Sequence, residues 1–146
     1  MDLEPITPEL AARADVQASE VMKGACDATL AMYAAAGSTP PWVGYLAGES
    51  GVFVGACAFK TPPQGAEGVE IAYFTFPGHE GRGVATRMAK RLMEIAEIEG
   101  VRPVRAQTLP EPNASTHILE KLGFKCQGPV QHPEDGTVWE WRLDSN

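Results

Sequence analysis

The sequence predicts a mixed α/β fold in which antiparallel strands lead into a strand–helix–strand–helix unit. Apolar runs at residues 42–46, 52–59 and 69–76 are separated by turn-forming residues, which is typical of strands. From residue 83 onward apolar residues recur at helical spacing, and a short strand pattern follows at 104–109. This order of elements favours one mixed sheet flanked by helices.

Length and charge limit the classes of function. The chain has 146 residues, of which 44% are apolar and 21% charged, and its formal net charge is −7. We expect a single domain, residues 1–146, with a sizeable core. Nucleic-acid binding requires a basic face, so it is not expected, whereas a cationic partner suits the charge. Because no apolar run approaches a membrane span and no leader pattern opens the chain, we expect a cytoplasmic protein without a membrane partner.

Cysteine and histidine spacing gives no sign of a metal site. Cys26, Cys57 and Cys126 are odd in number, widely spaced and free of any CxxC pattern. This favours a reducing compartment, with the three cysteines as small core residues. No His/Cys/Asp cluster has metal-ligand spacing, so no metal is predicted.

The first half of the chain reads as helices followed by a hairpin. Thr7 and Pro8 are typical of a helix N-cap and first position, and an alanine-rich, mostly helical region follows to about Ala36. Residues 42–46 and 52–59, joined by a Gly-containing segment, predict a β-hairpin. A loop at 61–68 then leads to the third strand, at 69–76.

The second half alternates helix and strand. A helix from Gly83 to Gly100 carries its apolar residues on one face. The strand at 104–109 is followed by a helix at 113–122, which Gly123 is expected to end. Residues 124–127 and 137–143 predict paired strands, and period two places Trp139, Trp141 and Leu143 on one face.

A glycine-rich stretch, PGHEGRGVAT at residues 77–86, stands between the third strand and the long helix. The stretch lacks the Gly-Lys-Ser/Thr of a nucleotide-triphosphatase loop, and it lacks the last glycine of a GxGxxG fingerprint. Two interpretations remain open from the glycines alone. One is a tight turn without a ligand, and the other is an anion site formed by backbone N–H groups at a helix start.

Two motifs at the correct separation resemble a known family. Residues 70–73, Pro77 and residues 80–85 resemble the acetyl-CoA signature of the GNAT superfamily of N-acetyltransferases. Residues 108–111, 113–115 and 119–124 resemble the branch that includes the ribosomal-protein N-terminal acetyltransferases. The similarity covers about residues 42–124.

The resemblance implies a fold and a co-substrate. The GNAT fold is a mostly antiparallel mixed sheet whose fourth and fifth strands splay apart, and the co-substrate is acetyl-CoA. Backbone groups of three strand residues would pair with the pantetheine arm, six amides at the helix start would hold the pyrophosphate, and one helix-capping residue would hydrogen-bond the pantetheine. In that order these residues are Phe74, Thr75 and Phe76; Gly81, Arg82, Gly83, Val84, Ala85 and Thr86; and Asn113.

Three positions depart from the family pattern. Glu80 stands where the family usually has Gln or Arg, and a carboxylate that points toward a pyrophosphate would repel it. Leu119 stands where many members carry a tyrosine as general acid, so that role must fall to another group or to water. In the branch that the chain resembles, an asparagine commonly stands where Pro112 does, so Asn113 is offset by one residue.

Acetyl transfer to an amine needs a base that removes a proton, and Glu70 is the candidate. Period two places Glu70 on one strand face with Ala72, Phe74 and Phe76, and a carboxylate among apolar neighbours suits a base. The alternative is a strand-end glutamate in water or paired with a cation. Some GNAT members use a glutamate at this strand position as base, and the resemblance therefore favours the catalytic role.

Ser115 is the second candidate catalytic residue. It lies in the first turn of the predicted second helix, and it resembles the serine proposed in this branch to assist the departing thiolate. The alternative is a capping or packing serine.

The function predicted from these residues is acetyl-CoA-dependent N-acetyl transfer. The acetyl group would move directly to a primary amine, with Glu70 or water as general base. The acceptor, a small molecule or a protein N-terminus or lysine, is not identified by the sequence, and a homodimer is left open. The alternative function is a non-catalytic acyl-CoA-binding or sensing domain of the same fold.

Overall fold

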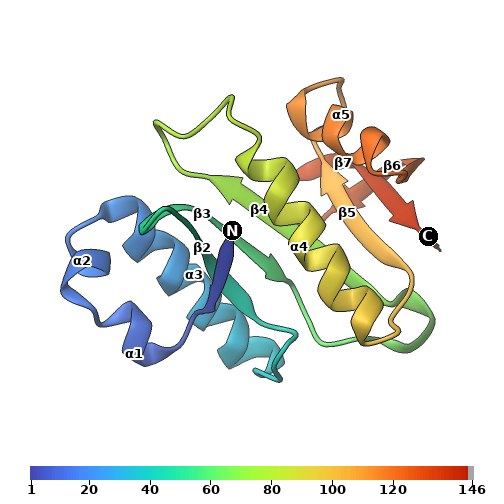
Figure 1. Ribbon diagram of the computed structural model, residues 1–146. Helices are drawn as coiled ribbons and strands as arrows, with labels where there is room; N and C mark the ends of the chain where they lie inside the picture. The colour runs from blue at the N-terminus through green and yellow to red at the C-terminus, as the bar shows by residue number, and fades with distance from the viewer. Residues whose placement is uncertain (145–146) are drawn as a thin grey trace.

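Residues 1–144 are described by a computed structural model, in which one seven-stranded sheet has the order β1-β2-β3-β4-β5-β7-β6 (Figure 1). The last two residues of the predicted 1–146 domain lie outside the described residues. The strands are β1 (Asp2–Pro5), β2 (Gly44–Glu49), β3 (Val52–Phe59), β4 (Val69–Thr75), β5 (Val104–Thr108), β6 (Lys125–His132) and β7 (Gly136–Leu143). The helices are α1 (Pro8–Ala11), α2 (Ala14–Gln17), α3 (Glu20–Ala36), the 3-10 turn η1 (Gly65–Glu67), α4 (Val84–Ile98) and α5 (Ala114–Lys121).

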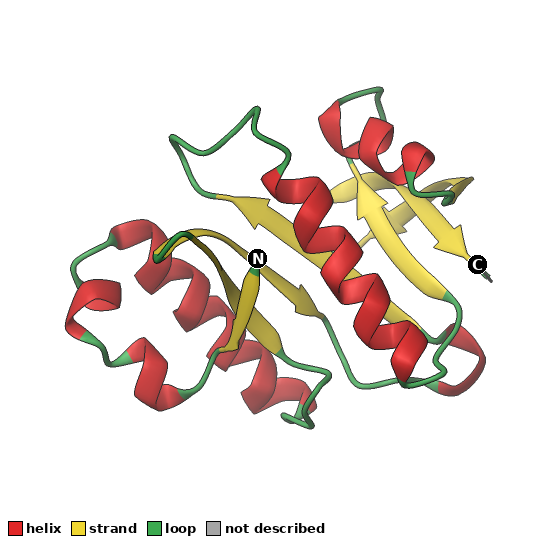
Figure 2. Ribbon diagram, in the orientation of Figure 1, coloured by secondary structure: helices red, strands yellow, loops and turns green. Residues whose placement is uncertain are grey.

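Helices cover both faces of the sheet. On β2, Tyr45 and Ala47 belong to the core that includes Met88 and Leu92 of α4, whereas Leu46 belongs to the core under α1–α3. Alternate residues of a strand point to opposite faces, so these two cores lie on the two sides of the sheet. Figure 2 shows α4 crossing one face over the middle of the sheet, with α1–α3 gathered beside β1–β3.

The N-terminal region contains a strand that the sequence pattern did not predict. β1 pairs antiparallel with β2, and its four residues are DLEP, without an apolar alternation. The pairing partner, β2, lies about forty residues away in the chain, so no local pattern marks this strand. The predicted helical region is three helices, and Ser19 starts the longest by accepting a hydrogen bond from the Met22 N–H at 3.2 Å.

The C-terminal strands form the predicted pair but enter the sheet out of chain order. β7 lies between β5 and β6. Trp141 and Leu143 are buried on the predicted face, and the Trp141 indole N–H donates to Thr108 Oγ1 at 3.0 Å. This contact ties β7 to the end of β5.

The central strands β4 and β5 separate, which confirms the predicted splayed sheet. They are parallel and pair only at Val69–Val104 and Glu70–Arg105. Beyond these pairs, β4 continues along β3 and β5 continues along β7. An opening between the two strands therefore begins directly after Glu70.

The cysteines only partly match the prediction of core residues. Cys26 and Cys57 are buried, and burial raises the pKa of Cys57 to about 12. Cys126 is exposed on β6, so the prediction was wrong for this residue.

None of the helices in residues 1–144 is long and apolar enough to cross a membrane.

Candidate active site

The opening between β4 and β5 exposes backbone hydrogen-bonding groups of β4. The Phe76 N–H donates to Val54 O of β3 at 2.9 Å. Because alternate residues of a strand direct their backbone groups to the same side, Phe74 also faces β3, while Tyr73 and Thr75 face the opening. Of the three residues expected to pair with a pantetheine arm, only Thr75 directs its own N–H and C=O toward the opening.

A small cavity of about 100 Å³ lies in this opening. It is lined by Lys60, Glu70, Ile71, Ala72, Tyr73, Ala106, Gln107 and Ser115. The two residues predicted to be catalytic, Glu70 and Ser115, therefore contribute to one cavity from β4 and α5.

Tyr73 is a functional candidate that sequence reasoning missed. Its hydroxyl lies 2.9 Å from Ser115 Oγ, and burial raises the pKa of the Tyr73 phenol. Leu119, at the position where many relatives carry a tyrosine, is fully buried in the core. Tyr73 belongs to the strand motif at residues 70–73, but the sequence gives no sign that its hydroxyl contacts α5. That contact exists because β4 and β5 separate.

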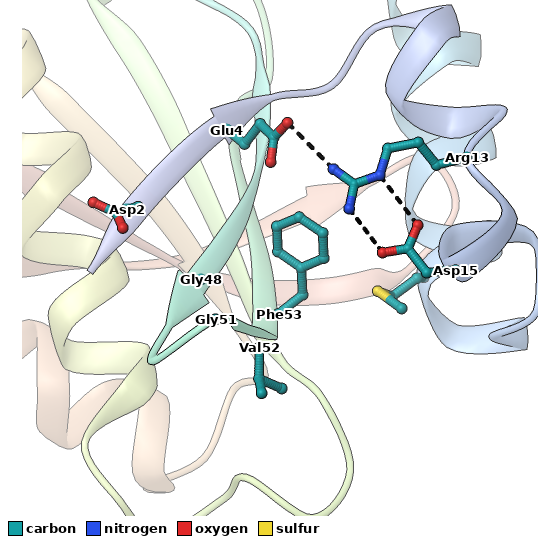
Figure 3. Close-up of a pocket in the computed structure, with 9 residues that line it drawn as sticks. Asp2, Glu4, Arg13, Asp15, Gly48, Gly51, Val52 and Phe53 are labelled. Carbon is teal, nitrogen blue, oxygen red and sulfur yellow. Dashed lines mark hydrogen bonds and ion pairs between the residues drawn. The ribbon is translucent and has the colours of Figure 1, made fainter.

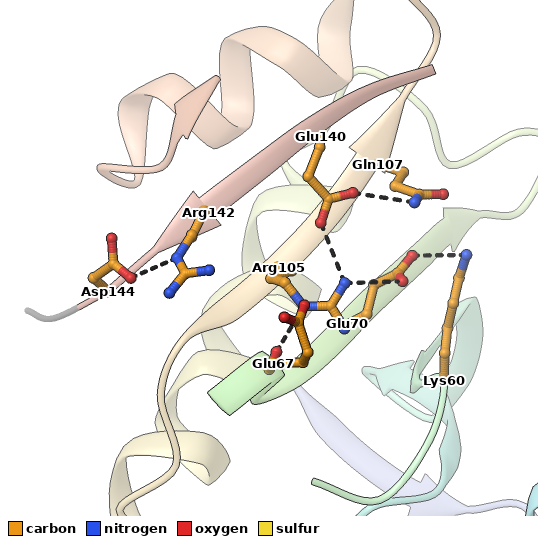
Figure 4. A network of polar contacts seen from close by, with 8 residues as sticks. All are labelled: Lys60, Glu67, Glu70, Arg105, Gln107, Glu140, Arg142 and Asp144. Atoms are coloured by element: carbon orange, nitrogen blue, oxygen red, sulfur yellow. Dashed lines mark hydrogen bonds and ion pairs between the residues drawn. The ribbon is translucent and has the colours of Figure 1, made fainter. Parts of the chain in front are cut away.

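Glu70 lies in an ion-pair network, so the expectation of apolar neighbours was wrong (Figure 4). Lys60 Nζ is 2.9 Å from Glu70 Oε2, and Arg105 Nη1 is 3.7 Å from Oε1. The side chain of Glu70 is only 13% exposed. Among the described residues, its buried Oε2 forms the ion pair with Lys60 but accepts no hydrogen bond of good geometry. The alternation of residues along β4 predicts only the neighbours of Glu70 on the same strand, whereas the cations Lys60 and Arg105 lie outside β4.

The same network closes the point where β4 and β5 separate. Arg105 Nη1 lies 3.2 Å from Glu140 Oε1 of β7, and Arg105 Nε donates to the Glu67 carbonyl at 2.6 Å. Gln107, which lines the cavity, donates to Glu140 Oε2 at 3.1 Å. Arg105 of β5 thus connects β4, β7 and η1 next to Glu70, which lines the cavity.

The glycine-rich stretch forms a turn that ends at the N-terminus of α4. Gly78, Gly81 and Gly83 have φ of 92°, 76° and 76°, in the left-handed region that side chains disfavour. Gly83 is the N-cap of α4, so the N–H groups of Val84 and the two residues after it have no acceptor within the helix. Free N–H groups at a helix start bind anions. The space beside Gly81 is open, because a side-chain carbon at this position would have no other heavy atom within 4 Å. A phosphate group fits this arrangement.

Two charged side chains, Arg87 and Glu80, form hydrogen bonds with backbone groups of the turn. Arg87 donates to Glu49 through Nε at 2.6 Å and Nη2 at 2.8 Å, and its Nη1 donates to the Arg82 carbonyl at 2.9 Å. The Arg87 guanidinium holds the pKa of Glu49 below its usual value. Glu80 accepts a hydrogen bond from the Gly78 N–H at 2.8 Å, so its carboxylate folds back over its own turn.

The family model of the acetyltransferase (GNAT) domain matches residues 2–125. The chain belongs to the GNAT family of acetyltransferases. It is therefore an acetyl-CoA-dependent N-acetyltransferase, with acetyl-CoA as co-substrate. A comparison with curated proteins finds no significant match.

Solved structures of other acetyltransferases share the fold of this GNAT protein. A RimL ribosomal L7/L12 alpha-N-protein acetyltransferase is similar with a TM-score of 0.74 at 13% identity, covering 97% of this chain and 91% of that one. An acetyltransferase from Agrobacterium tumefaciens str. C58 is similar with a TM-score of 0.65 at 21% identity, covering 98% and 90%. The microcin C7 self-immunity acetyltransferase MccE, in complex with acetyl-CoA and AMP, is similar with a TM-score of 0.67 at 13% identity, covering 86% and 71%.

Asn113 of this GNAT protein has a structural role at the start of α5. Its Oδ1 accepts a hydrogen bond from the Thr116 N–H at 2.9 Å, and its own N–H donates to Thr116 Oγ1 at 2.9 Å. This reciprocal capping box fixes the helix that carries Ser115. A contact between Asn113 and the pantetheine stays a prediction, and it would fall to the amide Nδ2.

The acetyltransferase has a further cavity on its α3 side. A groove of about 270 Å³ is lined by Ala25, Ala28, Thr29 and Met32 of α3 and by Ala56, Cys57, Ala58, Ala72, Tyr73 and Phe74 of β3 and β4. Ala72 and Tyr73 also line the cavity between β4 and β5, so the groove adjoins it.

A larger cavity, about 460 Å³, lies beside β1 and the β2–β3 hairpin and includes none of the candidate catalytic residues (Figure 3). The Arg13 side chain extends across it. Arg13 Nη2 is 2.8 Å from Asp15 Oδ2, Nη1 is 3.5 Å from Glu4 Oε1, and Cζ is 5.6 Å from the centre of the Phe53 ring. Arg13 therefore pairs with two of the carboxylates that line this cavity, Glu4 and Asp15. Among residues 1–144, no group of three or more His, Cys, Asp or Glu side chains is arranged to hold a metal ion.

Proposed function

We propose that this acetyltransferase moves the acetyl group from acetyl-CoA directly to a primary amine in the cavity between β4 and β5. One observation supports the proposal above the others. The separation of β4 from β5 brings Glu70, Tyr73 and Ser115 to the walls of one small cavity. A carboxylate and a phenol in the same cavity supply the acid and base that amide formation from a thioester requires.

The co-substrate would be held by backbone more than by side chains. The amides from Gly81 to Thr86 would surround the pyrophosphate at the start of α4, and the exposed Arg82 would add a positive charge. The pantetheine arm would enter the opening and pair with Thr75 of β4. In this arrangement the thioester would lie near Tyr73 and Ser115, beyond the point where the strands separate.

Glu70 would act as the base, directly or through a water molecule. Its Oε2 already forms an ion pair with the Lys60 ammonium, and this supports binding of a protonated primary amine at the same oxygen. Removing a proton from the acceptor makes its nitrogen a nucleophile. Lys60 and Arg105 compete with the acceptor for the carboxylate, so binding of the acceptor must replace part of this ion pairing.

Tyr73 would donate a proton to the departing thiolate. Ser115 fixes the orientation of the phenol through the 2.9 Å contact between the two hydroxyls. The raised pKa of Tyr73 keeps the phenol protonated at neutral pH. This assignment fills the role left open by Leu119.

The groove beside α3 supports an acceptor with an apolar body. None of its ten lining residues is charged, and the Thr29 hydroxyl already donates to the Ala25 carbonyl at 2.8 Å. The amine end would reach Glu70 past Ala72, while the apolar body would lie against α3. A second ammonium group would find no partner there, which disfavours polyamines.

Release of free thiol from acetyl-CoA, measured with a panel of amines, tests the proposal. The panel contains aryl-alkyl and aliphatic monoamines, a diamine, and a peptide with a free N-terminus. We expect fastest release with apolar monoamines. Tight coenzyme A binding without thiol release for any amine would support a non-catalytic acyl-CoA-binding domain and contradict the proposal.

A further inference from the structure

Lys60 carries a primary amine and lines the proposed catalytic cavity. It follows β3 directly, and its side chain lines the cavity together with Glu70, Tyr73 and Ser115. Its Nζ is 2.9 Å from Glu70 Oε2, and its side chain is 37% exposed. We propose that Lys60 is a self-acetylation site, modified by the acetyl-CoA bound to its own chain.

This inference rests on the proposed function, because it uses the same base and the same proton donor. Lys60 meets the requirements that the cavity sets for an acceptor: a primary amine, contact with the candidate base, and access to the opening where the thioester would lie. The network holds the side chain in place, so the amine needs no large movement to reach the cavity (Figure 4).

The other lysines lack this placement. Lys23, Lys90, Lys121 and Lys125 are exposed, and none of them lines the cavity. Lys23 pairs with Asp27 at 3.5 Å on the surface of α3. Reaction of these four with acetyl-CoA would depend only on solvent access, whereas reaction of Lys60 would depend on Glu70.

The chemical step balances without any further reactant. Glu70 takes a proton from the Lys60 ammonium, and the neutral Nζ attacks the acetyl carbonyl carbon. A C–N bond forms, the C–S bond breaks, and the sulfur takes a proton from Tyr73, which recovers one from Glu70 through solvent in the cavity. Of the two protons that leave Nζ, one ends on the thiol and the other goes to solvent.

Acetylation would change the charge of the site. The amide formed on Lys60 carries no positive charge, so Glu70 would keep only Arg105, at 3.7 Å, as a cationic neighbour. Glu70 Oε2 would then be available to the ammonium of an external acceptor.

The test incubates the full chain with isotopically labelled acetyl-CoA and no added amine, and follows intact mass and peptide mapping over time. We expect Lys60 to label roughly 10²–10⁴-fold faster than Lys90, the usual contribution of a positioned base. The rate per chain should not depend on protein concentration. Glu70→Gln should slow labelling of Lys60 and leave labelling of Lys90 unchanged.

Lys60→Arg keeps a cation beside Glu70 but cannot form a stable acetyl-lysine. On the time scale of Lys60 labelling, the wild-type protein should release one equivalent of thiol without acceptor, whereas the variant should show only the slow release that comes from the exposed lysines. Equal labelling of Lys60 and Lys90, or labelling of Lys60 that Glu70→Gln leaves unchanged, would overturn the inference. Thiol release to external amines with Lys60 unlabelled would overturn it while leaving the proposed function intact, and loss of both reactions would overturn both.

Discussion

The hydroxyls of Tyr73 and Ser115 lie 2.9 Å apart and join strand β4 to helix α5 across the opening of the sheet. Strand pairing does not impose this contact, because β4 has already left β5 at this level. Both residues line the cavity that Glu70 also lines. The contact therefore orients a phenol toward the region where a thiolate would be released.

Replacing Tyr73 by Phe removes the proton donor and keeps the ring. We expect kcat to fall by roughly 10²-fold or more, because a positioned acid contributes about 10²–10⁴-fold. The dissociation constant of acetyl-CoA should change little. Steady-state kinetics and calorimetric titration measure the two quantities.

The pH profile provides the control for this prediction. Burial raises the pKa of Tyr73 above the ordinary tyrosine value, so the phenol stays protonated, and the wild-type rate should decline only above about pH 10. That decline should be absent in Tyr73→Phe. Tyr45→Phe is a matched variant, because the Tyr45 hydroxyl donates to the Pro41 carbonyl at 2.6 Å and lies outside the cavity. If both variants kept wild-type kcat, Tyr73 would not be the acid.

Replacing Glu70 by Gln keeps the size of the side chain and removes the base. We expect turnover to fall by roughly 10²–10⁴-fold with little change in coenzyme A affinity. Glu140→Gln is the control, because Glu140 shares Arg105 with Glu70 but does not line the cavity. Equal losses in the two variants would mean that Glu70 acts only by holding Arg105 in place.

Replacing Gly83 by Ala tests the pyrophosphate site against a matched glycine at the other end of α4. Gly83 and Gly100 have φ of 76° and 70°, so alanine should cost about 1–2 kcal/mol of stability at either position. A Cβ at Gly83 also meets Arg87 Nη1 at 2.8 Å, the mobile end of a long side chain. Only Gly83→Ala should weaken coenzyme A binding in calorimetric titration. Unchanged affinity in a folded Gly83→Ala variant would contradict the assignment of this turn.

The Glu49–Arg87 pair should make stability depend on acid pH. Arg87 holds the pKa of Glu49 below its unfolded value, so the stabilisation is present above the unfolded pKa and lost as pH falls through the folded one. Glu49→Gln should lower the free energy of unfolding at pH 7 by about 0.2–1 kcal/mol, since the pair is partly exposed. The difference between variant and wild type should disappear in strong acid. A difference that persists there would show a packing effect instead of an electrostatic one.

A carboxylate placed in the groove should change the choice of acceptor. Ala28 lines the groove and is exposed, so Ala28→Asp adds a charge there at little cost to folding. We expect kcat/KM to fall for apolar monoamines and to rise for a diamine, whose second ammonium gains a partner. Ala34→Asp, exposed on the opposite side of α3, should leave both values unchanged. The same acceptor preference in all three proteins would exclude the groove as the acceptor site.

Much of this protein could be predicted from local sequence. The hydrophobic periods located the helices and most strands, and the glycines at 78, 81 and 83 marked a turn with positive φ. These features depend on residues within a few positions of one another, because helix, strand and turn geometry repeat over short distances. For the same reason the strand β1, whose partner is distant in the chain, left no signal.

The catalytic arrangement depends on tertiary structure. The sequence alone named Glu70 and Ser115 as candidates, but it placed Glu70 among apolar residues and gave Ser115 no partner. Lys60 and Arg105 reach Glu70 from outside β4, and Tyr73 reaches Ser115 only because β4 separates from β5. Strand order and the separation of two strands are set by the packing of the whole sheet against its helices, and no short-range pattern encodes the distances between side chains that this packing brings together.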